Sequence, residues 1–195
     1  MGHDGHDDHE HDHGHGHHHP KHDDHHHPHD VPHEHREHAP VSVAAYAITC
    51  SDTRTPADDE SGKLLRAELE KAGHNVVGQE IVRDDAAALR AAIAHALEHG
   101  ARAIVISGGT GIARRDVAVE TVNALFEKSL PGFGELFRML SFEEIGSAAW
   151  LSRAAAGTYR GALVFALPGS PNAVRLALHK LILPELGHAV RELLR

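Results

Sequence analysis

A short glycine-rich loop is the part of this chain whose residue types best suit chemistry. Residues 107–116 read Ser-Gly-Gly-Thr-Gly-Ile-Ala-Arg-Arg-Asp and follow the apolar run of residues 103–106, so the loop succeeds a buried strand and ends on a carboxylate. Glycines let backbone N–H groups approach an oxyanion, Thr110 adds a hydroxyl donor, and Asp116 can hold a cation that a phosphate shares. The same residues also fit a plain tight turn between a strand and a helix.

Two common nucleotide-binding motifs are excluded for this loop. A dinucleotide fingerprint needs a third glycine where Arg114 stands, and a P-loop needs Gly-Lys-Ser/Thr, which the loop lacks. An anion cradle remains open, because it depends on backbone geometry rather than on either pattern.

Strand-like and helix-like segments alternate along residues 41–195, which we expect to form one domain. The expected strands are residues 43–49, 76–82, 103–107 and 162–167. Helices are expected after Asp58 or Asp59, after Asp84, near Val119, after Pro131 and after Pro171. This alternation predicts an α/β fold with a mainly parallel sheet that helices cover on both faces.

In such a sheet, ligands bind beyond the carboxyl ends of the strands. That rule gathers four loops at one edge, namely residues 51–54, 83–85, 107–116 and 168–171. We therefore expect the glycine-rich loop to have the other strand-end loops as its partners.

Composition divides the chain near residue 40. Residues 1–40 contain 17 of the 22 histidines, and ten acidic against two basic residues give this segment a charge of −8, leaving −1 of the total −9 for the rest. The segment is too polar to offset the entropy of ordering, so we expect a disordered His/Asp-rich tail. Its imidazoles suit weak binding of ions such as Zn²⁺ or Ni²⁺, with a purely solvated extension or a purification tag as the alternatives.

Several classes of protein are unlike this sequence. Cys50 is the only cysteine, which excludes an intrachain disulfide and fits a small buried residue better than a nucleophile. The chain has neither an apolar run of membrane-spanning length nor a signal-peptide core, so we expect a cytoplasmic protein without a membrane partner. A near-neutral domain in a chain with 1 Trp, 2 Tyr and 5 Phe also argues against nucleic acid as a partner.

Five segments of the domain together resemble one known family. They are residues 107–111 (SGGTG), 113–116 (ARRD), 131–146 (PGFGELFRMLSFEEIG), 151–154 (LSRA) and 167–171 (LPGSP). In this order they are similar to the MoaB/MogA family of molybdenum cofactor biosynthesis, and residues 137–146 point to its MoaB branch. The resemblance spans nearly all of residues 43–190.

The resemblance implies a three-layer α/β/α sandwich, a homotrimer or homohexamer, and molybdopterin as ligand. Active members of the family transfer AMP from Mg-ATP to molybdopterin with release of pyrophosphate, and so prepare it for a molybdenum-insertion partner. Phosphoryl chemistry of this kind needs alignment, N–H donors and Mg²⁺, which the loop motifs can supply.

The resemblance also assigns roles to individual residues. Asp84 and Asp116 match the family's two functional aspartates and are expected to bind Mg²⁺ and act in catalysis. The residues expected to bind substrate lie in the strand-end loops and in the family motifs. They are Ser51, Asp52, Ser107, Gly108, Gly109, Thr110, Gly111, Glu135, Pro168, Gly169 and Ser170.

Structural roles remain open for several of these residues. Asp84 or Asp85 can cap the following helix, and either can be the functional carboxylate. Ser170 can cap a helix, and Glu135 can be a solvated or interface charge. For the whole protein, the alternatives to an adenylyltransferase are a noncatalytic molybdopterin-binding scaffold and a metal-handling protein that acts through its tail.

Overall fold

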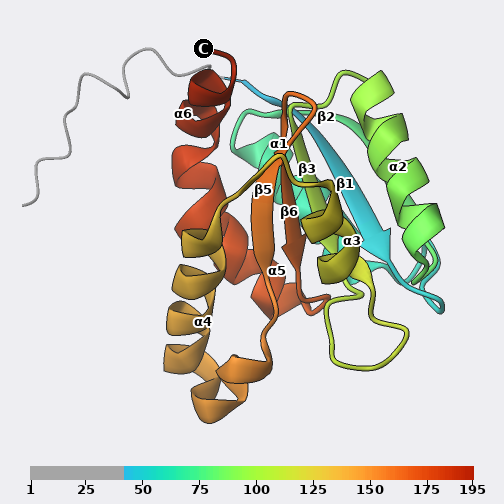
Figure 1. Ribbon diagram of the computed structural model, residues 1–195, viewed down its shortest axis with the longest axis vertical. Helices are drawn as coiled ribbons and strands as arrows, with labels where there is room; N and C mark the ends of the chain where they lie inside the picture. The colour runs from blue at the N-terminus through green and yellow to red at the C-terminus, as the bar shows by residue number, and fades with distance from the viewer. Residues whose placement is uncertain (1–41) are drawn as a thin grey trace, which may run out of the picture. The chain divides into compact units, whose positions relative to one another are not determined.

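A computed structural model describes residues 42–195 (Figure 1). Its core is a six-stranded sheet in the order β2-β1-β3-β6-β5-β4. The strands are β1 (Ala44–Cys50), β2 (Asn75–Val82), β3 (Ala103–Ser107), β4 (Lys128–Ser129), β5 (Ala155–Tyr159) and β6 (Ala162–Leu167). The strands β2, β1, β3 and β6 are parallel to one another, which confirms the predicted mainly parallel sheet.

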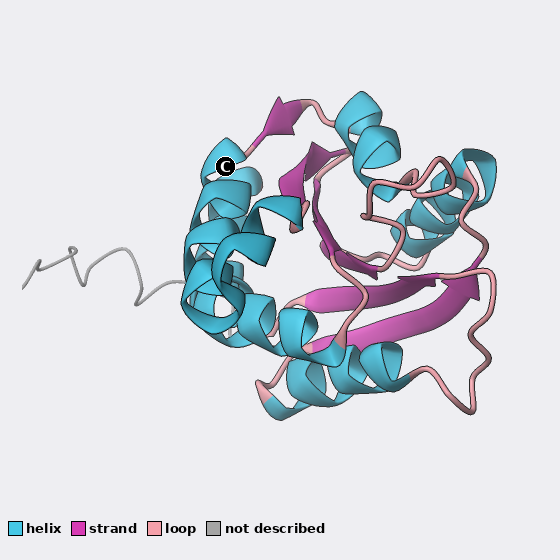
Figure 2. Ribbon diagram, turned by 90° about the horizontal axis from the view of Figure 1, so that it is seen from below, coloured by secondary structure: helices cyan, strands magenta, loops and turns pink. Residues whose placement is uncertain are grey.

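Helices cover both faces of the sheet, as predicted (Figure 2). They are α1 (Glu60–Lys71), α2 (Ala86–Glu98), α3 (Ala118–Leu125), α4 (Pro131–Ile145), α5 (Pro171–Ala177) and α6 (Leu183–Leu193). A 3₁₀ turn (Gly146–Leu151) follows α4, and a π-helical segment (Leu178–Ile182) joins α5 to α6. One core contains side chains of α1, α4, α5 and α6, and the other contains side chains of α2 and α3.

The alternation of side chains along β1 explains the two cores. Ala45 and Ala47 face the core that contains Leu65 of α1, whereas Tyr46 and Ile48 face the core of α2 and α3. Because a parallel strand is buried on both faces, its residues form a continuous apolar run in the sequence.

Side-chain caps start the helices whose first turns lie near the predicted site. Asp59 accepts a hydrogen bond from the N–H of Gly62 at 2.8 Å and caps α1, which resolves the predicted choice between Asp58 and Asp59. Ser170 accepts from the N–H of Ala173 at 3.2 Å and caps α5. Each cap satisfies an N–H group that has no partner within its helix.

The strands β4 and β5 were not predicted from the sequence. The strand β5 runs antiparallel to β6, and the two are joined by a tight turn in which Arg160 (φ 48°) and Gly161 (φ 76°) are both left-handed. Two left-handed residues are typical of a two-residue hairpin turn. The π-helical segment was also unforeseen; it precedes Pro184, which lacks the N–H that an α-helix would use there.

The predictions for residues 1–40, disorder and metal binding, lie outside the described residues. Within residues 42–195, no helix has both the length and the apolar character that crossing a membrane requires.

Candidate active site at the carboxyl edge of the sheet

The four predicted loops do meet at the carboxyl edge of the sheet. The N–H of Ser51, just after β1, donates to the carbonyl of Val82 at 2.8 Å, and the N–H of Gly108, just after β3, donates to the carbonyl of Leu167 at 3.0 Å. The glycine-rich loop and the loop of residues 168–171 are in direct contact, because a Cβ on Gly169 would lie 3.1 Å from the Cα of Gly108. Hydrogen bonds at the strand ends therefore hold the loops together.

The structure distinguishes the two neighbouring aspartates. Asp85 accepts from the N–H of Ala88 at 2.9 Å and is the cap of α2. Asp84 instead points at the glycine-rich loop, where its buried Oδ1 has no hydrogen-bond partner. A Cβ on Gly109 would lie 2.4 Å from that oxygen, so any larger residue would force the Asp84 carboxylate to move, and the φ of +63° at Gly109 also favours glycine.

Asp116 closes the far end of the glycine-rich loop. Its Oδ2 accepts from the N–H of Ala113 at 2.8 Å, and a Cβ on Gly111 would lie 2.6 Å from the same oxygen. The helix α3 begins only at Ala118, so Asp116 is a loop residue and not the helix cap. The half-exposed carboxylate is thus held within the loop.

The buried thiol of Cys50 lies next to these carboxylates. Burial, followed in order by a hydrogen bond between the thiol and the Asp84 carboxylate and by the negative charges of Asp84, Asp52 and Asp116, raises the pKa of Cys50 far above its usual range. The thiol therefore stays protonated, which fits the small buried residue that was expected rather than a nucleophile. The influence of all three carboxylates on one thiol indicates a region of negative potential that favours a cation.

The loop after β1 is braced by its own polar side chains. Ser51 Oγ accepts from the N–H groups of Thr53 and Arg54, both at 3.2 Å. Asp52 Oδ1 accepts from the N–H of Asp84 at 3.3 Å and lies 3.8 Å from Arg83 Nε, an exposed pair. Asp52 thereby fixes the backbone of the loop that carries Asp84.

The glycine-rich loop offers fewer free donors than its sequence suggests. The N–H of Gly108 is already bonded to Leu167, so it is not available to a phosphate. Ser107 and Thr110 are buried, and Ser107 Oγ lies 3.5 Å from Thr49 Oγ1. Arg153, also on a family-like motif, donates from Nη1 to the carbonyl of Gly111 at 3.1 Å and holds the loop from outside.

Two cavities that share lining residues lie beside these loops. The larger, of about 670 Å³, runs from the loop after β1 to the carboxyl end of β2 at the edge of the sheet. The smaller, of about 100 Å³, lies between the ends of β1 and β3 and is lined in part by Ser107, Gly108 and Gly169. Both are lined by Ser51, Arg54 and Asp59.

Sequence reasoning assigned no site role to three charged residues of the larger cavity. Arg54 and Lys63 are exposed cations at its wall, and buried Asp59 accepts from Thr49 Oγ1 at 2.7 Å. Their positions in and just after the first strand-end loop could have suggested a site role from the sequence. Only the structure shows that all three line the same cavity.

The structure separates Glu135 from the other predicted residues. Glu135 lies on α4 and lines a different hollow of about 240 Å³ together with Arg138, and none of the residues lining this hollow lines the strand-end cavities. A substrate-binding role for Glu135 therefore stays a prediction without support from its position.

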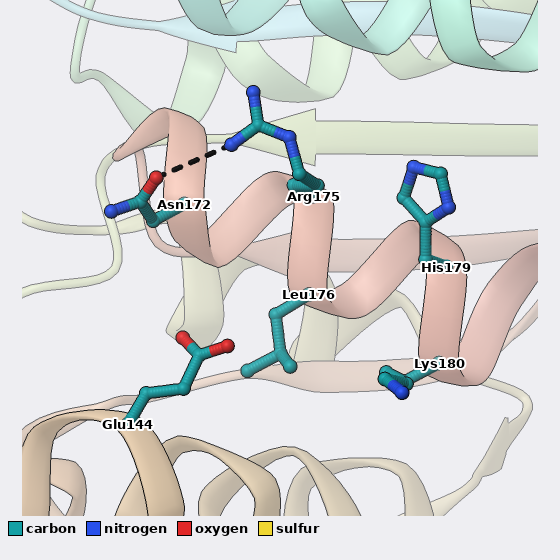
Figure 3. A pocket seen from close by; sticks show the side chains of 6 residues that line it. All are labelled: Glu144, Asn172, Arg175, Leu176, His179 and Lys180. Carbon is teal, nitrogen blue, oxygen red and sulfur yellow. Dashed lines mark hydrogen bonds between the residues drawn. The ribbon is translucent and has the colours of Figure 1, made fainter.

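A further hollow of about 460 Å³ lies between α4 and the α5 region (Figure 3). Figure 3 shows Glu144 of α4 facing the helical segment that carries Arg175, where the guanidinium donates to Asn172 Oδ1 at 3.3 Å. None of its lining residues lines the strand-end cavities, so it is not part of the candidate site.

The carboxylates at the strand ends suit a hard cation that is shared with a ligand. Within residues 42–195, no cluster of three or more His, Cys, Asp or Glu residues has the arrangement of a metal site. Mg²⁺ commonly takes only one or two carboxylates and completes its shell with phosphate oxygens and water. The unpartnered Asp84 Oδ1 and the loop-held Asp116 fit that pattern.

Comparison with known proteins assigns the fold and the family. Residues 46–188 match the family described as "Probable molybdopterin binding domain". Molybdenum cofactor biosynthesis protein B of Bacillus subtilis (strain 168) is 52% identical over 160 residues, which is 81% of this chain and 94% of the relative.

Solved structures agree with this match. The crystal structure of a molybdenum cofactor biosynthesis protein B, 51% identical, superposes with a TM-score of 0.77 over 80% of this chain and 99% of its own. The tungsten cofactor synthesizing protein MoaB from Pyrococcus furiosus, 41% identical, gives a TM-score of 0.74 over 80% and 100% of the two chains. The chain therefore belongs to the molybdenum cofactor biosynthesis protein B (MoaB) family and carries its molybdopterin-binding domain.

Proposed function

We propose that this MoaB-family protein is a molybdopterin adenylyltransferase. In this reaction an oxygen of the terminal phosphate of molybdopterin attacks the α-phosphorus of ATP. A new P–O bond forms, the bond between the α-phosphorus and its bridging oxygen breaks, and pyrophosphate leaves with the electron pair. Negative charge gathers on the phosphate oxygens, so alignment and electrostatic stabilisation are the main requirements of the reaction.

The buried and unpartnered Oδ1 of Asp84 is the observation that carries this proposal. A buried carboxylate oxygen without a donor is costly for the fold alone, and it is explained if a cation binds there when substrate is present. Asp84 and Asp116 would hold Mg²⁺, which supplies charge neutralisation at the phosphates. Gly109 leaves room for this carboxylate, because a Cβ at that position would lie 2.4 Å from Asp84 Oδ1.

The cavities supply the room for the substrates. A volume of about 670 Å³ falls within the usual range for small-molecule sites, and its cationic residues, Arg54 and Lys63, favour a polyphosphate. The glycine-rich loop and the loop of residues 168–171 would seat phosphate and pterin, with Arg153 keeping the former in position.

The direct test is transfer of label from [α-³²P]ATP to purified molybdopterin in the presence of Mg²⁺. The wild-type protein is expected to form adenylated molybdopterin, and Asp116→Ala to lose this activity. If wild type and Asp116→Ala are equally inert while both bind molybdopterin without ATP dependence, the protein is a noncatalytic binding member and the proposal is wrong.

We further propose that the protein is a homotrimer or homohexamer. An apolar surface on α4 and the following 3₁₀ turn supports this, because Met139, Phe142, Ile145 and Trp150 are 56%, 61%, 53% and 74% exposed. Light scattering is expected to give a trimeric or hexameric mass that Phe142→Ser/Trp150→Ser lowers. A monomeric wild type would contradict the proposal.

A further inference from the structure

Two histidines on α2 form a pair that the proposed reaction does not use. His95 and His99 are one helical turn apart, both are exposed, and their ring centroids lie 4.3 Å apart. They lie in the last turn of α2 and at its C-cap. Neither residue lines the strand-end cavities.

The hydrogen bond of His99 fixes which of its nitrogens is free. Its Nδ1 lies 2.9 Å from the carbonyl oxygen of His95. A carbonyl oxygen only accepts, so Nδ1 must carry the proton and donate it. In the neutral imidazole this leaves the lone pair on Nε2, on an exposed ring.

The surroundings of His95 fix the same tautomer. The hydroxyl of Tyr46 donates to Glu80 Oε1 at 3.0 Å, and His95 Nδ1 lies 3.2 Å from that hydroxyl oxygen and 3.3 Å from Glu80 Oε1. Burial, followed by the hydrogen bond to Glu80, raises the pKa of Tyr46 to about 12, so the phenol keeps its proton. Both groups facing His95 Nδ1 therefore offer an oxygen that accepts, and the lone pair of the neutral ring lies on Nε2.

This arrangement matches the surroundings of histidines that bind metals. A metal-ligating histidine commonly donates its other ring N–H to a carboxylate or a backbone carbonyl, which fixes the tautomer and orients the ring. Here Glu80 and the carbonyl of His95 are those acceptors, one for each ring.

We propose that His95 and His99 bind one divalent transition-metal ion of the Ni²⁺, Cu²⁺ or Zn²⁺ class through their Nε2 atoms. Imidazole suits these ions, and two rings one helical turn apart can share one ion. Within residues 42–195 no third His, Cys, Asp or Glu completes the cluster, so water fills the remaining positions. The alternative is that the pair only adds favourable charge at the helix C-terminus, and this alternative predicts no response to metal.

The test compares full-length wild type with His99→Gln and His95→Gln while NiCl₂ is added. The side chain of His99 is exposed, donates to a carbonyl of its own helix and, outside that helix, makes only an edge contact with the Tyr46 ring (centroids 6.1 Å apart) among the described residues, so His99→Gln is expected to fold normally. His188→Gln is the matched control, because His188 lies on α6 between Glu185 and Glu192 without a second histidine one turn away. All variants retain the 17 histidines of residues 1–40, so metal bound there contributes equally to each protein.

Binding to the folded pair is expected to raise the melting temperature of wild type and His188→Gln. At a hundredfold excess over the Kd the rise should be roughly 5–10 °C, and both α2 variants should lose most of it. Cu²⁺ added beyond the amount that residues 1–40 bind should also broaden the amide NMR signals of the last turn of α2 in wild type and not in His99→Gln. An equal rise in wild type and His99→Gln, or no rise together with unbroadened signals, would overturn the proposal.

Discussion

Replacing Asp84 with asparagine should make the protein more stable and far less active. The buried Oδ1 of Asp84 has no hydrogen-bond partner, and leaving a buried polar group unsatisfied costs about 1–3 kcal/mol, more when it is charged. Asparagine has the same shape without the charge, so it should recover part of this cost. We expect the free energy of unfolding to rise by about 1 kcal/mol, which corresponds to roughly 2–4 °C in melting temperature for a domain of this size.

The same substitution removes a charge from the proposed Mg²⁺ site. Losing one pre-oriented electrostatic contact to a reacting group commonly lowers the rate by about 10²–10³-fold. We therefore expect adenylyl transfer by Asp84→Asn to fall by at least that factor, with most of the fall in kcat. Opposite effects on stability and activity are typical of residues whose cost to the fold is retained for function.

The measurements are urea unfolding without nucleotide and label transfer from [α-³²P]ATP with saturating Mg²⁺. Asp85→Asn is the matched control, because asparagine caps helices about as well as aspartate, and it should leave both quantities nearly unchanged. A variant at Asp84 that is less stable by 1 kcal/mol or more would show that its carboxylate supports the fold. Unchanged transfer by the same variant would refute its role in the site.

Three further predictions concern the loops and the pH dependence. Gly109→Ala should lower the free energy of unfolding, measured in urea, by about 2–5 kcal/mol, because its Cβ would meet Asp84. Gly73 is the control: its φ is +87° and the space around it is open, so Gly73→Ala should lower the free energy of unfolding by only about 1–2 kcal/mol through backbone strain. Arg153→Ala should raise KM for ATP several-fold by releasing the glycine-rich loop, and an unchanged KM would contradict that role. Burial lowers the pKa of His74, so stability should fall as pH decreases through 6.5 towards the lowered value; His74→Gln should flatten this dependence between pH 7.5 and 5.5, and an equally steep curve would argue against it.

Much of the fold was predictable because burial on both faces of a parallel strand leaves a plain signal. The strand of residues 103–107 was predicted with the bounds that the structure shows, since five buried residues follow one another there. The short strands β4 and β5 gave a weaker signal, because β5 contains Gly157 and Thr158 and β4 has two residues, both exposed. Only the Arg160-Gly161 turn marked the hairpin.

The candidate site was predictable as a set of loops but not as a set of contacts. The rule for parallel sheets correctly brought the strand-end loops together, yet it could not decide between Asp84 and Asp85. That choice depends on which side chain reaches the N–H of Ala88, a matter of backbone angles. Likewise, no local pattern indicates that the N–H of Gly108 is bonded to Leu167 or that Glu135 lies in another hollow.

The backbone hydrogen bonds from Ser51 to Val82 and from Gly108 to Leu167 continue the hydrogen-bond pattern between the strands by one residue beyond the sheet. The register between neighbouring strands therefore sets the distances between the loops, and a change of register would displace the loops of the candidate site relative to one another. Heat should abolish the proposed activity in step with global unfolding rather than ahead of it, because these hydrogen bonds break only when the strands separate. Because each of these bonds is made by a backbone N–H, Ser51→Pro or Gly108→Pro should disrupt the loop that follows, since proline has no N–H to donate.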